Sequence, residues 1–110
     1  SYGKNGFVGE DRKVAVIPVG YAHGLQKQIE NSNPYVLIKE KKAYILGEIC
    51  MDMIIVDITG IKNVEVGDEA VIIGKQGKKE ITLLEMANWA DTIQDDILTG
   101  WNKSIKRTVK

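Results

Sequence analysis

The chain has 110 residues, of which 44% are hydrophobic and 27% are charged, with fifteen basic and fifteen acidic side chains. This length suits a single domain with its own core, and the balanced charge argues against a nucleic-acid-binding protein. No run approaches the ~20 apolar residues of a membrane span, and one histidine and one cysteine are too few for a usual zinc site. We therefore expect no nucleic acid, membrane or metal among its partners. A single cysteine cannot form an internal disulfide, which fits a reducing compartment such as the cytoplasm.

Short apolar strands recur through the first eighty residues. The segment 13–20 is rich in β-branched residues and ends at Pro18 and Gly20, which predicts a strand running into a turn. The segment 21–34 has no clean period and predicts a long loop. Further strands, separated by polar tips at 40–42 and 75–80, are predicted over 35–39, 43–49, 53–59 and 69–73. Short strands at such close spacing are typical of a β-sandwich or β-barrel.

The pattern changes after residue 80. Thr82 and Glu85 form a capping box, which predicts a short amphipathic helix that begins just after the threonine. Thr92, with Asp95 three residues later, is a second helix-start signal. The segment 104–109 alternates apolar and polar residues, as a closing strand should. The predicted fold is thus mainly β, a small barrel-like or sandwich-like domain with two short helices before the last strand.

The segment 50–57, CMDMIIVD, places a thiol, a thioether and a carboxylate ahead of an apolar run. A buried carboxylate costs several kcal/mol unless it is paired, so Asp52 is not expected inside the sheet. Either Asp52 lies at the rim of the sheet, or the chain bends there and leaves the amides of Met51 and Asp52 free. Free amides at the mouth of a strand can hold a carboxylate or a phosphate. The alternative is that Asp52 only satisfies a nearby turn.

Three further residues could carry chemistry. Tyr2 can act as a base only if its pKa, ordinarily about 10, is depressed by a neighbouring cation, and only Lys4 is close in sequence. Tyr21 and His23 follow a strand end, where loops commonly build sites. The chain has no serine–histidine–acid spacing and no glycine-rich phosphate loop. Taken alone, these residues indicate a β-rich domain with polar loop ends.

Seven separated motifs resemble, in the same order, the C-terminal domain of bacterial alanine racemases. They are SYG (1–3), VAVIPVGYAHGL (14–25), LGEICMDMIIVDIT (46–59), VEVGDEAVIIGKQG (64–77), EITLLEMA (80–87), DTI (91–93) and SIKR (104–107). The resemblance covers nearly the whole chain. It implies an enzyme that interconverts L- and D-alanine with pyridoxal 5'-phosphate. It also implies an N-terminal (β/α)₈ barrel that holds the cofactor lysine, and a head-to-tail homodimer that completes each active site.

The resemblance assigns roles to four residues. Tyr2 matches the second catalytic base, and Tyr21 matches a tyrosine at the substrate entrance. Met51 matches the residue whose amide holds the substrate carboxylate, and Asp52 lies beside it. None of the lysines matches the cofactor lysine, so we expect the 110 residues alone to be inactive. Because the chain starts at Ser1 without a methionine, we expect it to be a fragment of a longer protein.

Two positions depart from the family pattern. His23 stands where an acid is usual, and Asp95 stands where a tyrosine usually touches the cofactor phosphate. Since a carboxylate repels a phosphate dianion, Asp95 is a doubtful cofactor ligand and is better explained as part of the second helix cap. Two other functions therefore stay open. The chain could belong to a serine racemase, or it could be a binding or regulatory module that kept the fold and lost the reaction.

Overall fold

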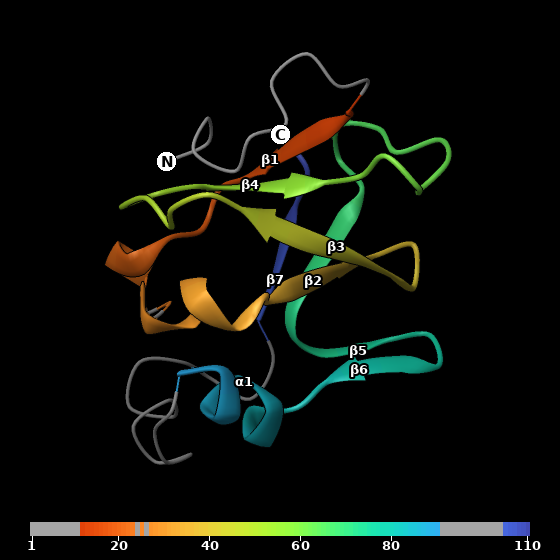
Figure 1. The fold of residues 1–110 in the computed structure, drawn as a ribbon. Coiled ribbons are helices and arrows are strands. Elements are labelled where there is room, and N and C mark those ends of the chain that lie inside the picture. Colours follow the sequence, from red (N-terminus) through yellow and green to blue (C-terminus); the bar gives the residue numbers. More distant parts are fainter. Residues whose placement is uncertain (1–11, 24, 26, 91–104) are drawn as a thin grey trace.

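The computed structural model describes residues 12–23, 25, 27–90 and 105–110 (Figure 1). Their strands are β1 (Val14–Ile17), β2 (Tyr35–Ile38), β3 (Lys41–Leu46), β4 (Ile54–Asp57), β5 (Glu69–Gln76), β6 (Lys79–Ile81) and β7 (Ile105–Thr108). These seven strands form one sheet in the order β1-β4-β3-β2-β5-β6, with β7 also paired to β5. The sheet curls into half a barrel, which confirms the mainly β prediction, and β7 confirms the predicted closing strand.

The core of the half-barrel starts with the antiparallel pair β1 and β4. In this pair Ala15 lies opposite Val56, and Ile17 lies opposite Ile54. All four side chains are buried, whereas the residues that alternate with them are partly or fully exposed. This period of two is why the apolar segments form strands rather than helices. Full burial of each isoleucine stabilises the fold by roughly 1.5–3 kcal/mol.

Strand β5 is buried on both faces. Ile72 belongs to the main core, while Val71 belongs to a second cluster with Leu37 and Ile81. The side chain of Trp89, from the helix α1 (Leu83–Ala90), packs against both clusters. The helix therefore packs beside the sheet, and it lies next to β6 in the lower part of Figure 1.

The predicted capping box is half correct. The Glu85 amide donates to Thr82 Oγ1 at 3.0 Å, so Thr82 caps α1 as expected. The other half of the box is wrong, because the Glu85 carboxylate accepts a hydrogen bond from the Tyr35 hydroxyl instead. A half-buried phenol needs an acceptor, and the carboxylate provides one across the sheet. The predicted second helix, with Thr92 and Asp95, lies outside the described residues. Of the described helices, none has the length and apolar character needed to cross a membrane.

The predicted long loop at 21–34 contains two short 3₁₀ helices, η2 (Tyr21–His23) and η3 (Lys27–Ser32). The prediction of an irregular loop is therefore only partly right. Leu25 and Ile29 are 2% and 1% exposed, so this segment packs into the core. Ser32 Oγ donates to the carbonyl of Trp89 at 2.8 Å, which ties the end of η3 to α1.

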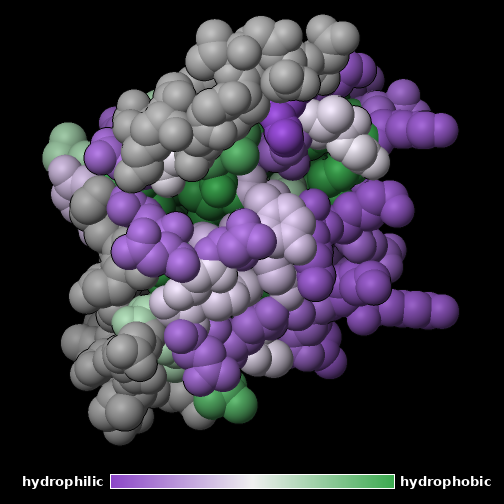
Figure 2. Space-filling view, in the orientation of Figure 1, coloured by the Kyte–Doolittle hydropathy of each residue, from purple (hydrophilic) through white to green (hydrophobic). Residues whose placement is uncertain are grey.

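Two hairpin tips meet on one side of the molecule. The β2–β3 tip consists of Lys39 and Glu40, whose φ angles of 52° and 62° resemble those of a type I′ turn. Glu40 is held there because its amide donates to Gln76 Oε1 at 2.7 Å and its carboxylate accepts from the Lys78 amide at 3.1 Å. Hydrophilic side chains cover these projecting tips in Figure 2, as expected. The predicted bounds of 40–42 and 75–80 are wrong, because the turns lie at 39–40 and 77–78 and the polar residues beside them continue the strands β3, β5 and β6.

Candidate functional site

The candidate site is the loop that leads into β4, and we call residues 50–52 the lip. The Cys50 amide donates to the carbonyl of Met53 at 3.2 Å, so the chain bends here and β4 begins only at Ile54. Within the described part of the chain, no hydrogen bond is donated by the amides of Met51 or Asp52. Met51 is 55% exposed and Asp52 is also exposed. The structure agrees with the alternative in which the chain bends and leaves these amides free, and the exposed Asp52 also lies at the rim of the sheet.

The helix η2 is attached to the lip through the backbone. The Tyr21 amide donates to the carbonyl of Cys50 at 3.0 Å, and the Ala22 amide donates to the carbonyl of Met51 at 2.9 Å. The side chain of Tyr21 is 47% exposed. Two segments about thirty residues apart are therefore locked together, with an exposed tyrosine on one and two unused amides on the other.

Gly20 makes this close approach possible. A Cβ atom at this position would lie 2.6 Å from both the carbonyl carbon and the carbonyl oxygen of Met51, and closer still to the carbonyl oxygen of Cys50. These are backbone atoms, which cannot rotate away as a side chain can. Any larger residue at position 20 would therefore push η2 and the lip apart.

The structure brings together three of the residues singled out from the sequence: Tyr21, Met51 and Asp52. Tyr2 and Asp95 lie outside the described residues. The lip can donate two hydrogen bonds to an anion from its backbone, and it carries one carboxylate that can attract a cation. This combination suits the paired carboxylate and ammonium groups of an amino acid.

Glu30 is a neighbour of the lip that the sequence did not reveal. Its Oε2 atom accepts a hydrogen bond from the amide of Ile49 at 2.7 Å, directly before the lip. The two residues are nineteen positions apart, and nothing in the local pattern of 27–32 announces the contact. Gly20 was noted only as part of a turn, because a close approach between distant backbone segments has no local signature.

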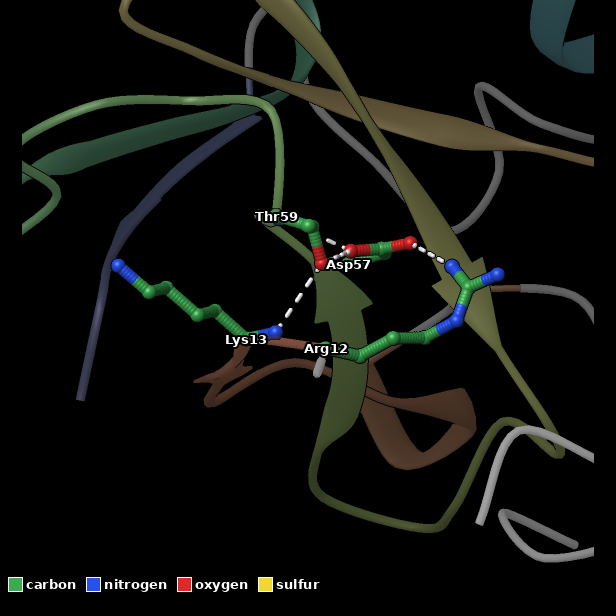
Figure 3. A network of polar contacts seen from close by, with 4 residues as sticks. All are labelled: Arg12, Lys13, Asp57 and Thr59. Carbon is green, nitrogen blue, oxygen red and sulfur yellow. Dashed lines mark hydrogen bonds and ion pairs between the residues drawn. The ribbon is translucent and has the colours of Figure 1, made fainter. Parts of the chain in front are cut away.

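The opposite end of the β1–β4 pair carries a closed polar network (Figure 3). Arg12 Nη1 lies 2.5 Å from Asp57 Oδ2, and the Thr59 hydroxyl donates to Asp57 Oδ1 at 2.6 Å. The Thr59 amide also donates to Asp57 Oδ1, and the Lys13 amide donates to Thr59 Oγ1. Burial raises the pKa of Asp57, but the hydrogen bonds from Thr59 and the Arg12 guanidinium outweigh it and lower that pKa below its ordinary value. The carboxylate of Asp57 and the hydroxyl of Thr59 are both bonded within the protein, so the network explains structure and not ligand binding.

A second closed cluster surrounds Tyr35. Its ring lies 4.9 Å from that of Trp89 between centroids, and Lys42 Nζ lies 4.8 Å from the Tyr35 ring centroid. Burial raises the pKa of Tyr35 to about 12, and the hydrogen bond to the Glu85 carboxylate adds to that rise. This phenol therefore keeps its proton at neutral pH. It clamps α1 onto β2 and is not a candidate base.

The chain matches the family described as "Alanine racemase, C-terminal domain" over residues 1–109. It is 41% identical to an alanine racemase of Halothermothrix orenii over 110 residues, which are all of this chain and 29% of that relative. It is 44% identical over 89 residues to a protein of Enterococcus faecalis named amino-acid racemase, covering 81% of this chain and 12% of that protein.

A solved structure supports the same relationship. The fold resembles that of the alanine racemase from Bacillus anthracis with a TM-score of 0.75 and 27% sequence identity, over 84% of this chain and 23% of that one. The chain thus spans less than a third of the length of these relatives. Its sequence match and its fold place it in the alanine racemase C-terminal domain family.

Proposed function

We propose that this chain is the C-terminal part of a pyridoxal-phosphate-dependent alanine racemase and that the lip contacts the amino-acid substrate. The observation that carries the proposal is the pair of unused amides at Met51 and Asp52, held beside the exposed Tyr21 in a member of this family. Unused amides on an exposed, fixed turn are ready donors for a carboxylate.

Each residue has a distinct task in this proposal. The Met51 amide donates a hydrogen bond to the substrate carboxylate, and Tyr21 lines the entrance. Asp52 favours approach of the substrate ammonium group and disfavours a second anion at the same place. Tyr2 is the second acid/base, because racemisation requires that a proton leave one face of Cα and that a proton be added to the other. A positioned side chain that moves a proton in this way typically contributes 10²–10⁴-fold to the rate.

The cofactor belongs elsewhere in the protein. The segments that form the site, 20–22 and 49–53, contain no lysine, and Asp52 would repel a phosphate dianion. These residues do not fit pyridoxal phosphate itself. We therefore assign the cofactor to an N-terminal barrel domain outside this chain, where it acts as an electron sink when bound.

The shared site requires a second subunit. In our proposal the protein is a cytoplasmic homodimer, and the lip and Tyr2 of one subunit reach the barrel of its partner. The 55% exposure of Met51 supports this arrangement, since a second subunit can cover this side chain. We propose no nucleic acid, membrane or metal as a partner.

The test is racemisation by the pyridoxal-phosphate-loaded enzyme that carries this chain as its C-terminal domain. We expect conversion of L- to D-alanine, and a fall in kcat of about 10²-fold or more for Tyr2→Phe, since the substitution removes only the ionisable hydroxyl. Undiminished activity of Tyr2→Phe would overturn the assignment of the base. Absence of racemisation by the wild-type enzyme would favour a binding or regulatory module.

Serine is the main alternative substrate. The Enterococcus faecalis relative is named for amino acids in general and is 44% identical to this chain over the matched region. Serine differs from alanine by one hydroxyl, which an apolar pocket cannot strongly reject. We expect a higher kcat/KM for alanine, and the reverse order would identify a serine racemase.

A further inference from the structure

The lip is held from two sides, by η2 and by Glu30. The 3₁₀ helix η2 binds the carbonyls of Cys50 and Met51 through its own amides. The pairing of β3 with β4 ends at Leu46 and Ile55, before the lip begins. Gly47, with a φ of 68°, turns the chain away from the strand.

The Ile49 amide lies beyond the end of this ladder, close to the core. The Ile49 side chain is 1% exposed, so its amide is largely shielded from water and needs an acceptor in the protein. Glu30 Oε2 provides it at 2.7 Å, and Glu30 is partly buried. A hydrogen bond to a carboxylate is roughly twice as strong as one between neutral groups.

Glu30 is itself firmly placed. Its neighbour Ile29 is 1% exposed in the core, and η3 ends at Ser32, whose hydroxyl is bonded to the carbonyl of Trp89 in α1. A contact thus runs from the helix, through η3 and Glu30, to the residue that precedes the lip. Loss of the Glu30 carboxylate would remove this hydrogen bond from the N-terminal side of the lip.

We propose that Glu30 is a positioning residue for substrate binding: through the Ile49 amide it fixes the lip so that the Met51 amide faces the substrate carboxylate. This rests on the proposed racemase function and deepens it. Glu30 does not touch the substrate, so its loss should weaken binding and leave the proton transfers intact.

The test compares Glu30→Ala and Glu30→Gln with Glu85→Ala in the enzyme that carries this chain. Glu30→Ala should raise the KM for alanine about 3- to 10-fold with kcat changed less than about twofold, since one binding contact is misplaced. Glu30→Gln keeps a carbonyl oxygen for the Ile49 amide and should stay within about twofold of wild type. Glu85→Ala removes a carboxylate from another long-range hydrogen bond and should leave KM unchanged. An unchanged KM in Glu30→Ala, with only a lower Tm, would overturn the proposal.

A second readout separates this proposal from the racemase function. The amides of Tyr21 and Ala22 donate to the carbonyls of Cys50 and Met51, so their hydrogen exchange reports the position of the lip. Their exchange should accelerate in Glu30→Ala and stay as in wild type in Glu85→Ala. If hydrogen exchange of these amides is unchanged in Glu30→Ala, the proposal that Glu30 fixes the lip is wrong, even if the enzyme is a racemase. If wild type does not racemise alanine, the proposed function fails, and this exchange result still decides the role of Glu30 in fixing the lip.

Discussion

The two ends of the β1–β4 pair differ in how their polar groups are hydrogen-bonded. At one end, Asp57 accepts hydrogen bonds from Thr59 and an ion pair from Arg12, so that its carboxylate is saturated within the protein. At the other end, the bend at the lip leaves the amides of Met51 and Asp52 without acceptors in the described part of the chain. Strand ends must satisfy their polar groups with protein, water or a ligand.

One end of the strand pair is therefore saturated with hydrogen bonds, whereas the other keeps two unused donors. The closed end contains more charged side chains, namely Arg12, Lys13 and Asp57. The open end contains one carboxylate and two free donors on a backbone that Gly20 and Glu30 hold in place. The candidate site is identified by unused hydrogen-bond donors on a fixed backbone rather than by its charge.

The largest expected effect comes from Gly20→Ala at the open end. The added Cβ would collide with the backbone of Cys50 and Met51, so we expect a loss of about 3 kcal/mol in the free energy of unfolding. A displaced lip should also lower kcat/KM by about 10²-fold. Urea unfolding and steady-state racemisation assays measure the two effects.

Gly60→Ala is the matched control, because a Cβ there would meet no atom within 4 Å. Its free energy of unfolding should stay within about 0.5 kcal/mol of wild type. Equal losses in the two alanine variants would show that the close approach at Gly20 is not the cause.

A moderate effect is expected for Tyr35→Phe, in the closed cluster on β2. The loss of the hydrogen bond to Glu85 should cost about 1 kcal/mol of stability at neutral pH, without a change in KM. Folding raises the pKa of Tyr35 from its ordinary value near 10 to about 12. Tyr35 therefore contributes stability that is fully present below about pH 10 and is lost as the pH rises toward 12. The wild-type unfolding free energy should therefore fall more steeply than that of Tyr35→Phe between pH 10 and 12. Parallel curves, or a raised KM, would contradict this assignment.

The smallest effect is expected for Asp57→Asn at the closed end. The lowered pKa of Asp57 contributes stability that is present above its unfolded value near 3.9 and is lost as the pH falls through the folded value. Because the ion pair with Arg12 is partly exposed, we expect a loss of about 0.5–1 kcal/mol at pH 7. That loss should shrink below about pH 4, and racemisation should be unaffected. Thermal unfolding at several pH values checks the first point, and a fall in kcat/KM would show that the two ends are coupled.

The sequence predicted what depends on local pattern. The apolar, β-branched composition of 13–20 and 53–59 predicts strands, and Thr82 predicts the start of α1. It could not predict contacts between distant segments. The Glu85 carboxylate accepts a hydrogen bond from the Tyr35 hydroxyl on β2 instead of completing the capping box. The buried Leu25 and Ile29 turn a composition typical of loops into packed 3₁₀ helices.

The candidate site shows the same division. The free amides follow from the conflict between Asp52 and the apolar run behind it, which is visible in the sequence. The roles of Tyr21 and Met51 came from the family resemblance, and their proximity comes from the structure. Gly20 and Glu30 contact the residues at the lip across nineteen or more positions, and no local pattern reveals such contacts.

The most direct test observes the Met51 amide during substrate binding. The chain contains three methionines, Met51 in the lip, Met53 just after it and Met86 in α1, so selective isotopic labelling of methionine amides gives a probe and an internal reference. Assigned by single substitutions to leucine in the cofactor-loaded enzyme, the Met51 signal should shift on addition of alanine while the Met86 signal stays in place. A Met51 signal that does not move at saturating alanine would contradict the claim that the lip holds the substrate.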